Sequence, residues 1–207
     1  LFSRDCLEVE LALPDGRTLT VLNNHFKSKL VIESNPAKRA AKEQAARNKR
    51  QRQAQRVMDI VRERFAGRAF ESELFAVVGD FNDQPDSPAV QPLLKNSGLE
   101  NVLNRLPKQE RWTDYYKSGG DVSQLDYLLL SPALSKLSAG ALPTLERAGI
   151  GFRALNAAQD VLPKQIKLVG SETDEGLAID FGFARYEGVT PKKVASDHCP
   201  MCIRFEV

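Results

Sequence analysis

The fold is decided by the stretch ELFAVVGDFND at residues 73–83. Its first part, residues 73–79, is a short continuous apolar run, which is typical of a strand buried on both faces. The run ends at Asp80, and further polar side chains follow at Asn82 and Asp83. Functional groups commonly lie where a buried strand gives way to a loop. This stretch therefore supplies a central strand and candidate functional residues together.

Alternation and apolar runs indicate further strands on both sides of this stretch. Residues 7–13 alternate between apolar and polar side chains, Pro-Asp-Gly at 14–16 is a turn signal, and residues 17–26 return as a second strand. Residues 124–131 form a second buried run, and residues 201–207 alternate again. We expect one α+β domain with an antiparallel sheet core, opening with a hairpin.

A long basic helix is predicted from near Pro36 to Gly67. Residues 38–68 carry 11 Lys and Arg against 3 acids, so they contribute +8 to a total net charge of +2. The second half has an apolar stripe that should dock on a sheet, formed by Val57, Ile60, Val61 and Phe65. The first half, 37–53, is polar almost all round. Either it lies along a phosphate backbone or its charges simply keep an alanine-rich helix solvated.

The remaining elements are less clearly marked. Residues 87–96 are predicted as a short helix with Ser87 as N-cap and Pro88 at the first helical position. Residues 132–195 contain scattered Gly and Pro and indicate loops and short elements, with one strand expected around 177–184.

Composition excludes several classes of protein. Hydrophobic residues make up 42% of the 207 residues, which excludes a disordered tail. No apolar run approaches the roughly 18–20 residues of a membrane-spanning helix. Three cysteines exclude a fold built on disulfides, although a Cys6–Cys202 bridge stays open. Cys199 and Cys202 have C-x-x-C spacing without a second ligand pair or a helix start, so core packing is the favoured role for Cys6 and Cys202.

Four polar clusters fall where predicted strands stop, at residues 23–29, 79–83, 124–127 and 196–198. The only two histidines of the chain, His25 and His198, lie in these clusters. Taken singly, each cluster has an ordinary structural explanation, such as an Asx turn or a hydrogen-bonded histidine. Taken together, two histidines, three carboxylates and an asparagine are the groups that metal-assisted phosphate hydrolysis requires.

The order N-x-H-x-K-S, G-D-F-N-D, L-D-Y-L-L-L-S and S-D-H resembles the endonuclease/exonuclease/phosphatase superfamily, which has the deoxyribonuclease-like fold. The version HFKSK at residues 25–29 resembles most the branch that contains bacterial extracellular nucleases. The resemblance implies a four-layer α/β/β/α sandwich of two mainly antiparallel sheets. It also implies that residues 1–207 are the C-terminal portion of one such domain, incomplete at the N-terminus.

The resemblance also implies roles for individual residues. His25 matches the first catalytic histidine, Asp80 the aspartate that aligns the attacking water, and Asn82 its partner. Asp126 matches the carboxylate that orients the second histidine, which is His198. The resemblance implies that Asp197 helps to hold the metal and that Lys27 binds substrate phosphate. The lone Trp112 lies in a segment that can line the family's cleft, but core packing is its favoured role.

One family feature is missing from the sequence. The family's principal Mg²⁺ ligand is a glutamate on an early strand, and Glu8 and Glu10 are poor substitutes because they alternate on the expected solvent face. We therefore expect an upstream segment or a second polypeptide to complete the fold. A sandwich without central strands would otherwise keep open edges.

The functional expectation is a Mg²⁺-dependent phosphodiesterase, a nuclease acting on DNA or RNA, with Mn²⁺ or Ca²⁺ as alternative ions. The alternatives are a phosphatase or phospholipid phosphodiesterase of the same fold, and a non-catalytic nucleic-acid-binding relic. The compartment stays open, because the branch resemblance suggests secretion or a periplasmic location whereas unpaired cysteines fit the cytoplasm equally.

Overall fold

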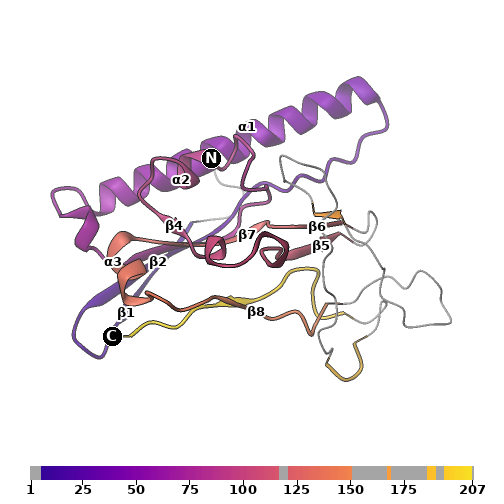
Figure 1. Ribbon diagram of the computed structural model, residues 1–207. Helices are drawn as coiled ribbons and strands as arrows, with labels where there is room; N and C mark the ends of the chain where they lie inside the picture. The colour runs from indigo at the N-terminus through magenta and orange to yellow at the C-terminus, as the bar shows by residue number, and fades with distance from the viewer. Residues whose placement is uncertain (1–5, 117–120, 151–166, 169–185, 190–193, 207) are drawn as a thin grey trace.

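A five-stranded sheet at the centre of the molecule confirms the expected α+β class (Figure 1). The computed structural model describes residues 6–116, 121–150, 167–168, 186–189 and 194–206. The sheet order is β1-β2-β3-β7-β4, with β1 at Leu7–Ala12, β2 at Thr18–His25, β3 at Phe75–Asp80, β7 at Asp126–Leu130 and β4 at Glu100–Asn101. β2 and β3 run parallel and the other pairs antiparallel. The parallel pair is possible because a long helix connects its strands.

Two smaller sheets and three helices complete the described structure. β5 (Asp114–Tyr116), β6 (Asp121–Ser123) and β9 (Lys167–Leu168) form one sheet, and β8 (Thr144–Leu145) pairs with β10 (Met201–Cys202). The helices are α1 (Pro36–Arg64), α2 (Gln91–Leu94) and α3 (Pro132–Leu137), and 3₁₀ turns occur at Phe70–Ser72, Val102–Arg105 and Lys108–Glu110. Within the described part of the chain, no helix combines the length and the apolar character needed to cross a membrane.

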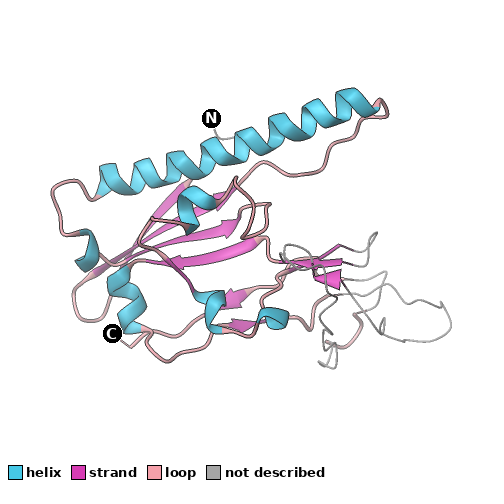
Figure 2. Cartoon of the chain, turned by 45° about the horizontal axis from the view of Figure 1, so that its top comes forward, coloured by secondary structure: helices cyan, strands magenta, loops and turns pink. Residues whose placement is uncertain are grey.

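Helix α1 covers one face of the large sheet (Figure 2). It begins after Asn35, whose side chain accepts a hydrogen bond from the Lys38 backbone N–H. The second half buries the expected stripe, with Val57 and Val61 at 0% exposure and Phe65 at 5%, whereas Ile60 is only partly buried. Each fully buried side chain of this kind contributes ~1.5–3 kcal/mol. The second half of α1 is therefore held by the sheet.

The strands of the sheet divide their side chains between two faces. On β3, Phe75 and Val77 pack in the core beneath α1, whereas Ala76 and Val78 belong to a second core on the opposite face. On β7, Tyr127 and Leu129 face α1 in the same way, and Leu128 and Leu130 lie on the opposite face. That second core also contains side chains of α3 and of the C-terminal segment, namely Leu134, Leu137, Ile203 and Phe205. Both faces of the central strands are thus buried, as their continuous apolar sequence predicted.

The helix predicted at 87–96 is much shorter in the structure. α2 spans only Gln91–Leu94, and residues 87–90 form turns in which the Ser87 hydroxyl accepts a hydrogen bond from the Ala89 N–H. The physical reason is Pro92, which would clash with the carbonyl four residues earlier in any helix that began at Ser87. Starting the helix at Gln91 places Pro92 in the first turn, where it needs no N–H partner.

The strand predicted at 201–207 is also shorter than expected. β10 contains only Met201–Cys202, and Cys202 pairs with Thr144. Extending this antiparallel register would place Ile203 opposite Pro143, which has no N–H to donate to the ladder. The strand expected around 177–184 lies outside the described residues.

Cysteine and glutamate predictions had mixed outcomes. All three cysteines are free, so the Cys6–Cys202 bridge is not formed. Cys6 packs against the core, as predicted. Cys202 is exposed, so the prediction that it packs in the core was wrong. Glu8 and Glu10 are exposed, and both form ion pairs with Arg64 of α1. They are therefore not placed to substitute for a metal-binding glutamate.

Candidate active site

Three of the predicted site residues lie side by side across the large sheet. His25 at the end of β2 is in register with Asp80 at the end of β3, and Asp80 is in register with Asp126 at the start of β7. The side chains of β3 alternate, so Asp80 shares the face of Ala76 and Val78, opposite α1. His25 Nε2 lies 3.3 Å from Asp80 Oδ2. We call His25, Asp80 and Asp126 the polar rung.

His198 joins the polar rung from a segment 72 residues further along the chain. Its Nδ1 lies 2.7 Å from Asp126 Oδ2, and its Nε2 lies 3.7 Å from Asp114 Oδ1. The hydrogen bond with Asp126 raises the pKa of His198 to about 9, against a smaller opposing effect of burial. The imidazole is therefore protonated at neutral pH and is held in one orientation by the carboxylate.

Asn82 closes the turn that follows β3. It adopts a left-handed conformation with φ of 54°, in which its backbone N–H donates to Asp80 Oδ1 and its side-chain Nδ2 donates to Asp80 Oδ2, both at 2.7 Å. Nδ2 also donates to the Phe26 carbonyl at 3.3 Å. Asn82 therefore fixes the Asp80 carboxylate and ties it to the chain after β2.

Gly79 allows the two strand ends to approach each other. It has a φ of +121°, and a Cβ at this position would lie 1.9 Å from the Asn24 carbonyl oxygen. Only glycine accommodates both the conformation and the contact. The first residue of the G-D-F-N-D motif is thus required by the backbone geometry that brings His25 beside Asp80.

An aromatic stack lies on the other side of the sheet from the polar rung. Phe26, Phe81 and Tyr127 each directly follow a residue of the polar rung and belong to the core under α1. The Phe26 and Phe81 rings stack with centroids 4.7 Å apart, and Phe81 and Tyr127 stack at 4.6 Å. All three side chains are 0–1% exposed. We call them the aromatic rung; sequence analysis missed it, although the pairs HF, DF and DY were visible.

Asp114 is a site residue that sequence analysis also missed. It lies on β5 next to Trp112 and Thr113, where its carboxylate faces His198 Nε2. Burial, and secondarily the neighbouring carboxylates of Asp197, Asp126 and Asp80, raise its pKa to about 6, against the opposing effect of His198. The signal available in the sequence was its place after Trp112-Thr113. Trp112 itself is 1% exposed, which confirms core packing, and the Arg147 guanidinium lies 4.1 Å from its ring centroid.

Thr113 fixes the start of β7. Its Oγ1 accepts hydrogen bonds from the backbone N–H groups of Leu125 and Asp126, both at 3.0 Å. Since Thr113 is fully buried, these bonds are shielded from water. They hold the backbone from which the Asp126 carboxylate reaches His198.

Two predicted residues lie at the border of this cluster. The Asp197 side chain is exposed, and its backbone carbonyl accepts a hydrogen bond from the Tyr115 N–H at 2.9 Å. Lys27 is half-buried, and its backbone N–H donates to Gln53 Oε1 at 2.9 Å while its carbonyl accepts from Arg50 Nη1 at 3.1 Å. Metal binding by Asp197 and phosphate binding by Lys27 stay predictions.

Asp83, the last residue of the G-D-F-N-D motif, forms a buried ion cluster with residues of α1 and of the loop after β2. Its carboxylate lies 2.8 Å from Arg50 Nε of α1 and 3.1 Å from Lys29 Nζ. Its backbone carbonyl accepts a hydrogen bond from the Tyr127 hydroxyl at 2.7 Å. Arg50 also bonds the Lys27 carbonyl, so it braces the loop after β2 and the loop after β3 against one helix.

Oxygen atoms dominate the set of groups that could hold a metal. Within the described residues, Asp80, Asp126 and His198 offer ligand atoms within 4.8 Å of one another. His198 and Asp126 already satisfy each other, and a protonated imidazole is not a ligand. The fit is better for the carboxylates, because the pKa of Asp80 is also raised, by burial and by Asp126. Carboxylates that repel one another suit a hard divalent cation.

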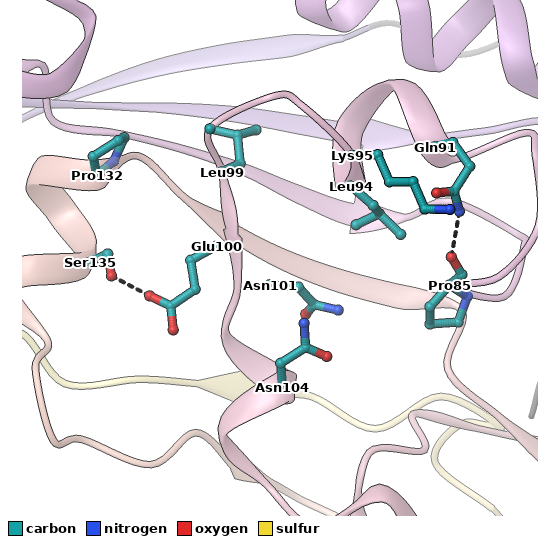
Figure 3. A pocket seen from close by; sticks show the side chains of 11 residues that line it. Pro85, Gln91, Leu94, Lys95, Leu99, Glu100, Asn101, Asn104, Pro132 and Ser135 are labelled. Atoms are coloured by element: carbon teal, nitrogen blue, oxygen red, sulfur yellow. Dashed lines mark hydrogen bonds between the residues drawn. The ribbon is translucent and has the colours of Figure 1, made fainter.

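A separate hollow of about 550 Å³ lies between α2, β4 and α3 (Figure 3). Its lining residues include Gln91, Lys95, Glu100 and Asn104, and none of the polar rung. Within it, Glu100 accepts a hydrogen bond from Ser135, and Gln91 Nε2 donates to the Pro85 carbonyl at 2.7 Å. The hollow is therefore separate from the candidate site at the strand ends.

Comparisons with solved structures found similar chains of low sequence identity. They include the 3'-5' exonuclease NExo from Neisseria meningitidis, at 14% identity and a TM-score of 0.49, covering 97% of this chain and 65% of that one. A Neisseria NExo 3' phosphatase bound to a product DNA hairpin is 13% identical, with a TM-score of 0.47 and the same coverage. A Staphylococcus aureus beta toxin variant with bound magnesium ions is 20% identical, with a TM-score of 0.39, covering 58% of this chain and 40% of that one.

The chain thus spans between two fifths and two thirds of the length of these structures. No curated protein sequence matched the chain. The model of the Endonuclease/Exonuclease/phosphatase family matches residues 7–198, which include the whole polar rung and His198. The chain belongs to that family of phosphoester hydrolases, whose members use a divalent metal.

Proposed function

We propose that this protein is a Mg²⁺-dependent nuclease that hydrolyses phosphodiester bonds in DNA or RNA. The observation that carries the proposal is the hydrogen bond between His198 and Asp126, which adds the second histidine to the polar rung. One protonated imidazole, one oriented carboxylate at Asp80 and a second histidine at His25 provide a complete set of proton-transfer and charge-stabilising groups.

In this mechanism the Asp80 carboxylate, held by Asn82, orients a water molecule and accepts its proton as the oxygen attacks phosphorus. Its raised pKa makes it a stronger base than an ordinary aspartate. The bond from phosphorus to the leaving oxygen breaks, and His198 donates its Nε2 proton to that oxygen. The products are a 5'-phosphate and a 3'-hydroxyl. His25 contacts the phosphate undergoing attack, and Lys27 binds a neighbouring phosphate oxygen.

Asp197 and Asp114, whose carboxylates interact electrostatically, would hold the divalent ion of the family. Their carboxylate oxygens are the hard donors that Mg²⁺ prefers, and Mn²⁺ or Ca²⁺ would bind to the same donors. When bound, the ion supplies positive charge at the phosphate oxygens. It would also lower the elevated pKa of Asp114 by offsetting the surrounding negative charge.

We also propose that the chain is the C-terminal portion of its domain and that an upstream segment or a second polypeptide covers the β1 edge. Leu7 and Leu11 on β1 are 57% and 47% exposed, and β1 is the outer strand of the sheet. An exposed apolar edge strand is a site where further strands pair. The location of the protein, secreted or periplasmic, stays a prediction.

The test is hydrolysis of plasmid DNA, RNA, a phosphomonoester and a phospholipid, each with Mg²⁺, Mn²⁺, Ca²⁺ or chelator. Both this chain and a version extended upstream are assayed. Asp126→Asn removes the partner of His198 and is expected to lower turnover at least ~100-fold, whereas Asp59→Asn, a surface carboxylate paired with Arg62, serves as the matched control.

The outcomes separate the alternatives. Nucleic-acid cleavage in Mg²⁺ that is lost in chelator supports the proposal. Turnover of the phosphomonoester or phospholipid alone moves the function to a phosphatase or phospholipid phosphodiesterase. If both forms are folded and inactive but bind nucleic acid, the protein is a non-catalytic relic.

A further inference from the structure

The first half of α1 is held differently from the second half. Figure 2 shows that it extends past the end of the large sheet. It buries only Ala46, Arg50 and Gln53, whereas the second half buries four residues in less length. Its exposed surface carries Lys38, Arg39, Lys42 and Arg47. The first half of α1 is therefore a basic segment that lies beyond the end of the sheet and follows the loop that leads from His25.

A shallow groove of about 360 Å³ lies between this half of α1 and the loop that follows β2. Its lining includes Lys27, Leu30, Ile32, Lys42, Ala46 and Lys49. Leu30 is 72% exposed and Ile32 is 87% exposed. The groove therefore has three ammonium groups and an apolar border, with no acidic residue in its lining.

The three lysines of the groove differ in whether they form ion pairs. Lys42 forms an ion pair with Glu33 at 2.7 Å, but among the described residues neither Lys27 nor Lys49 has an ion pair. Like charges held beside one helix repel, so their arrangement is stabilised by an anionic occupant. Lys27 lies two residues after His25, so the loop that lines the groove begins directly after the polar rung in the chain.

The groove chemistry favours a nucleic-acid strand over a lipid surface. A membrane-binding helix needs an apolar face opposite its charges, and the first half of α1 is polar almost all round. A single strand presents regularly spaced phosphates together with exposed base faces, which match the lysines and the apolar border.

We propose that this groove binds the phosphates of a single nucleic-acid strand flanking the scissile bond, with Lys42 and Lys49 contacting phosphates and Leu30 and Ile32 contacting bases. The inference rests on the proposed function, and it names the surface that selects a polymer over a small phosphoester. Lys27 lines the groove at the end nearest to His25 in the sequence.

The experiment measures binding of a fluorescent 20-nucleotide single strand in chelator over a range of salt concentrations. The double variant Lys42→Gln/Lys49→Gln is compared with Lys108→Gln/Lys136→Gln, which removes two exposed lysines elsewhere. Loss of two phosphate contacts should make the slope of log K against log salt shallower by ~1.4. Raising the salt from 50 to 200 mM should therefore weaken strand binding by the double variant ~7-fold less than strand binding by the wild-type chain. Leu30→Ser/Ile32→Ser should weaken binding without changing the slope.

Failure of this inference is distinguishable from failure of the proposed function. If the groove variant and the control variant bind the strand equally, the groove proposal is wrong whatever the hydrolysis assay gives. If the slope falls as expected but no substrate is hydrolysed, the groove stands and the nuclease proposal fails. Binding of the wild-type chain to vesicles containing phosphatidylserine, with no strand binding, would overturn the nucleic-acid assignment in favour of a membrane surface.

Discussion

The polar rung and the aromatic rung occupy neighbouring positions in the sequence but opposite faces of the sheet. His25, Asp80 and Asp126 face away from α1, and the next residue after each, Phe26, Phe81 and Tyr127, lies beneath α1. The two rungs differ in solvation, since the His25 side chain is 44% exposed whereas the aromatic side chains are 0–1% exposed. Each residue proposed for catalysis is therefore followed directly in the sequence by a core residue that packs on the opposite face of the sheet.

This comparison predicts that substitutions on the two faces have separable effects. The polar rung lies at strand ends, so its removal should cost activity with little loss of stability. The aromatic rung lies inside a packed core, so its removal should cost stability.

The largest expected effect is on activity, from His198→Ala. Loss of the proton donor should lower turnover of a phosphodiester by ~10³-fold or more, equivalent to ~4 kcal/mol of transition-state stabilisation. The free energy of unfolding should fall only by the ~1–2 kcal/mol that the hydrogen bond between His198 and Asp126 contributes, because the aromatic rung is left intact. Turnover and melting temperature are measured on the same preparation. Near-normal turnover in a folded variant would show that the role given to His198 is wrong.

The next effect is on stability, from Tyr127→Ala. The substitution removes a fully buried ring from the aromatic rung and should lower the free energy of unfolding by ~3–5 kcal/mol. Tyr127→Phe keeps the stack but removes the hydrogen bond to the Asp83 carbonyl, and should cost only ~1–2 kcal/mol. Tyr116→Ala, at a residue 58% exposed, is the control and should change stability by less than ~0.5 kcal/mol. Equal losses of stability in all three variants would contradict the view that the aromatic rung holds the fold.

Arg50→Met tests the brace that joins both loops to α1. Among the described residues it leaves the buried Asp83 carboxylate with Lys29 alone as an ion partner, at an expected cost of about 3 kcal/mol. Denaturant unfolding gives the cost, and steady-state kinetics show whether the loops have moved, since KM should rise more than kcat falls. Arg50→Lys keeps the charge but loses the bond to the Lys27 carbonyl, so it should recover part of the stability. If Arg50→Met costs little stability and leaves KM unchanged, Arg50 acts only through packing and the brace is refuted.

The smallest effect is the pH dependence of stability. His198 has a folded-state pKa of about 9, above its ordinary 6.5, because of Asp126. The stabilisation of the folded state by the protonated His198 is therefore complete below about pH 6.5 and is lost as the pH rises through about 9. We expect the free energy of unfolding to fall on the order of 1–2 kcal/mol over this interval after screening by solvent. Asp126→Asn should remove this slope, and Asp59→Asn should leave it unchanged; a slope that survives Asp126→Asn would assign it to another group.

Much of the central sheet could be predicted because its signals are local. The apolar run before Asp80 and the alternation in the opening hairpin each follow from strand geometry alone. The polar residues of the candidate site were found in the same way, as His25, Asp80 and Asp126 directly terminate or begin such runs. The sequence did not predict that these three side chains lie on one face of the sheet, because this depends on the register between strands whose residues are up to 101 positions apart.

Other features depended on tertiary contacts that no local pattern carries. Asp114 gives no signal in the sequence beyond its neighbours, and its raised pKa exists only because the fold buries it near the carboxylates of Asp197, Asp126 and Asp80. Arg50 looked like one of many basic residues on a solvated helix, yet it is 4% exposed and pairs with Asp83. The short α2 was predictable in principle, since Pro92 was in the sequence.

Gly79 has a consequence for mutational tolerance. Its missing Cβ leaves room for the Asn24 carbonyl, and every other amino acid would place an atom 1.9 Å from that oxygen. In a saturation library selected for activity, position 79 should be as intolerant of substitution as Asp80, although glycine has no side chain to act on a substrate. The activity selection alone would therefore make Gly79 look like a catalytic residue. Melting temperatures of the Gly79 variants would show that its role is a backbone contact, because these variants would also lose stability.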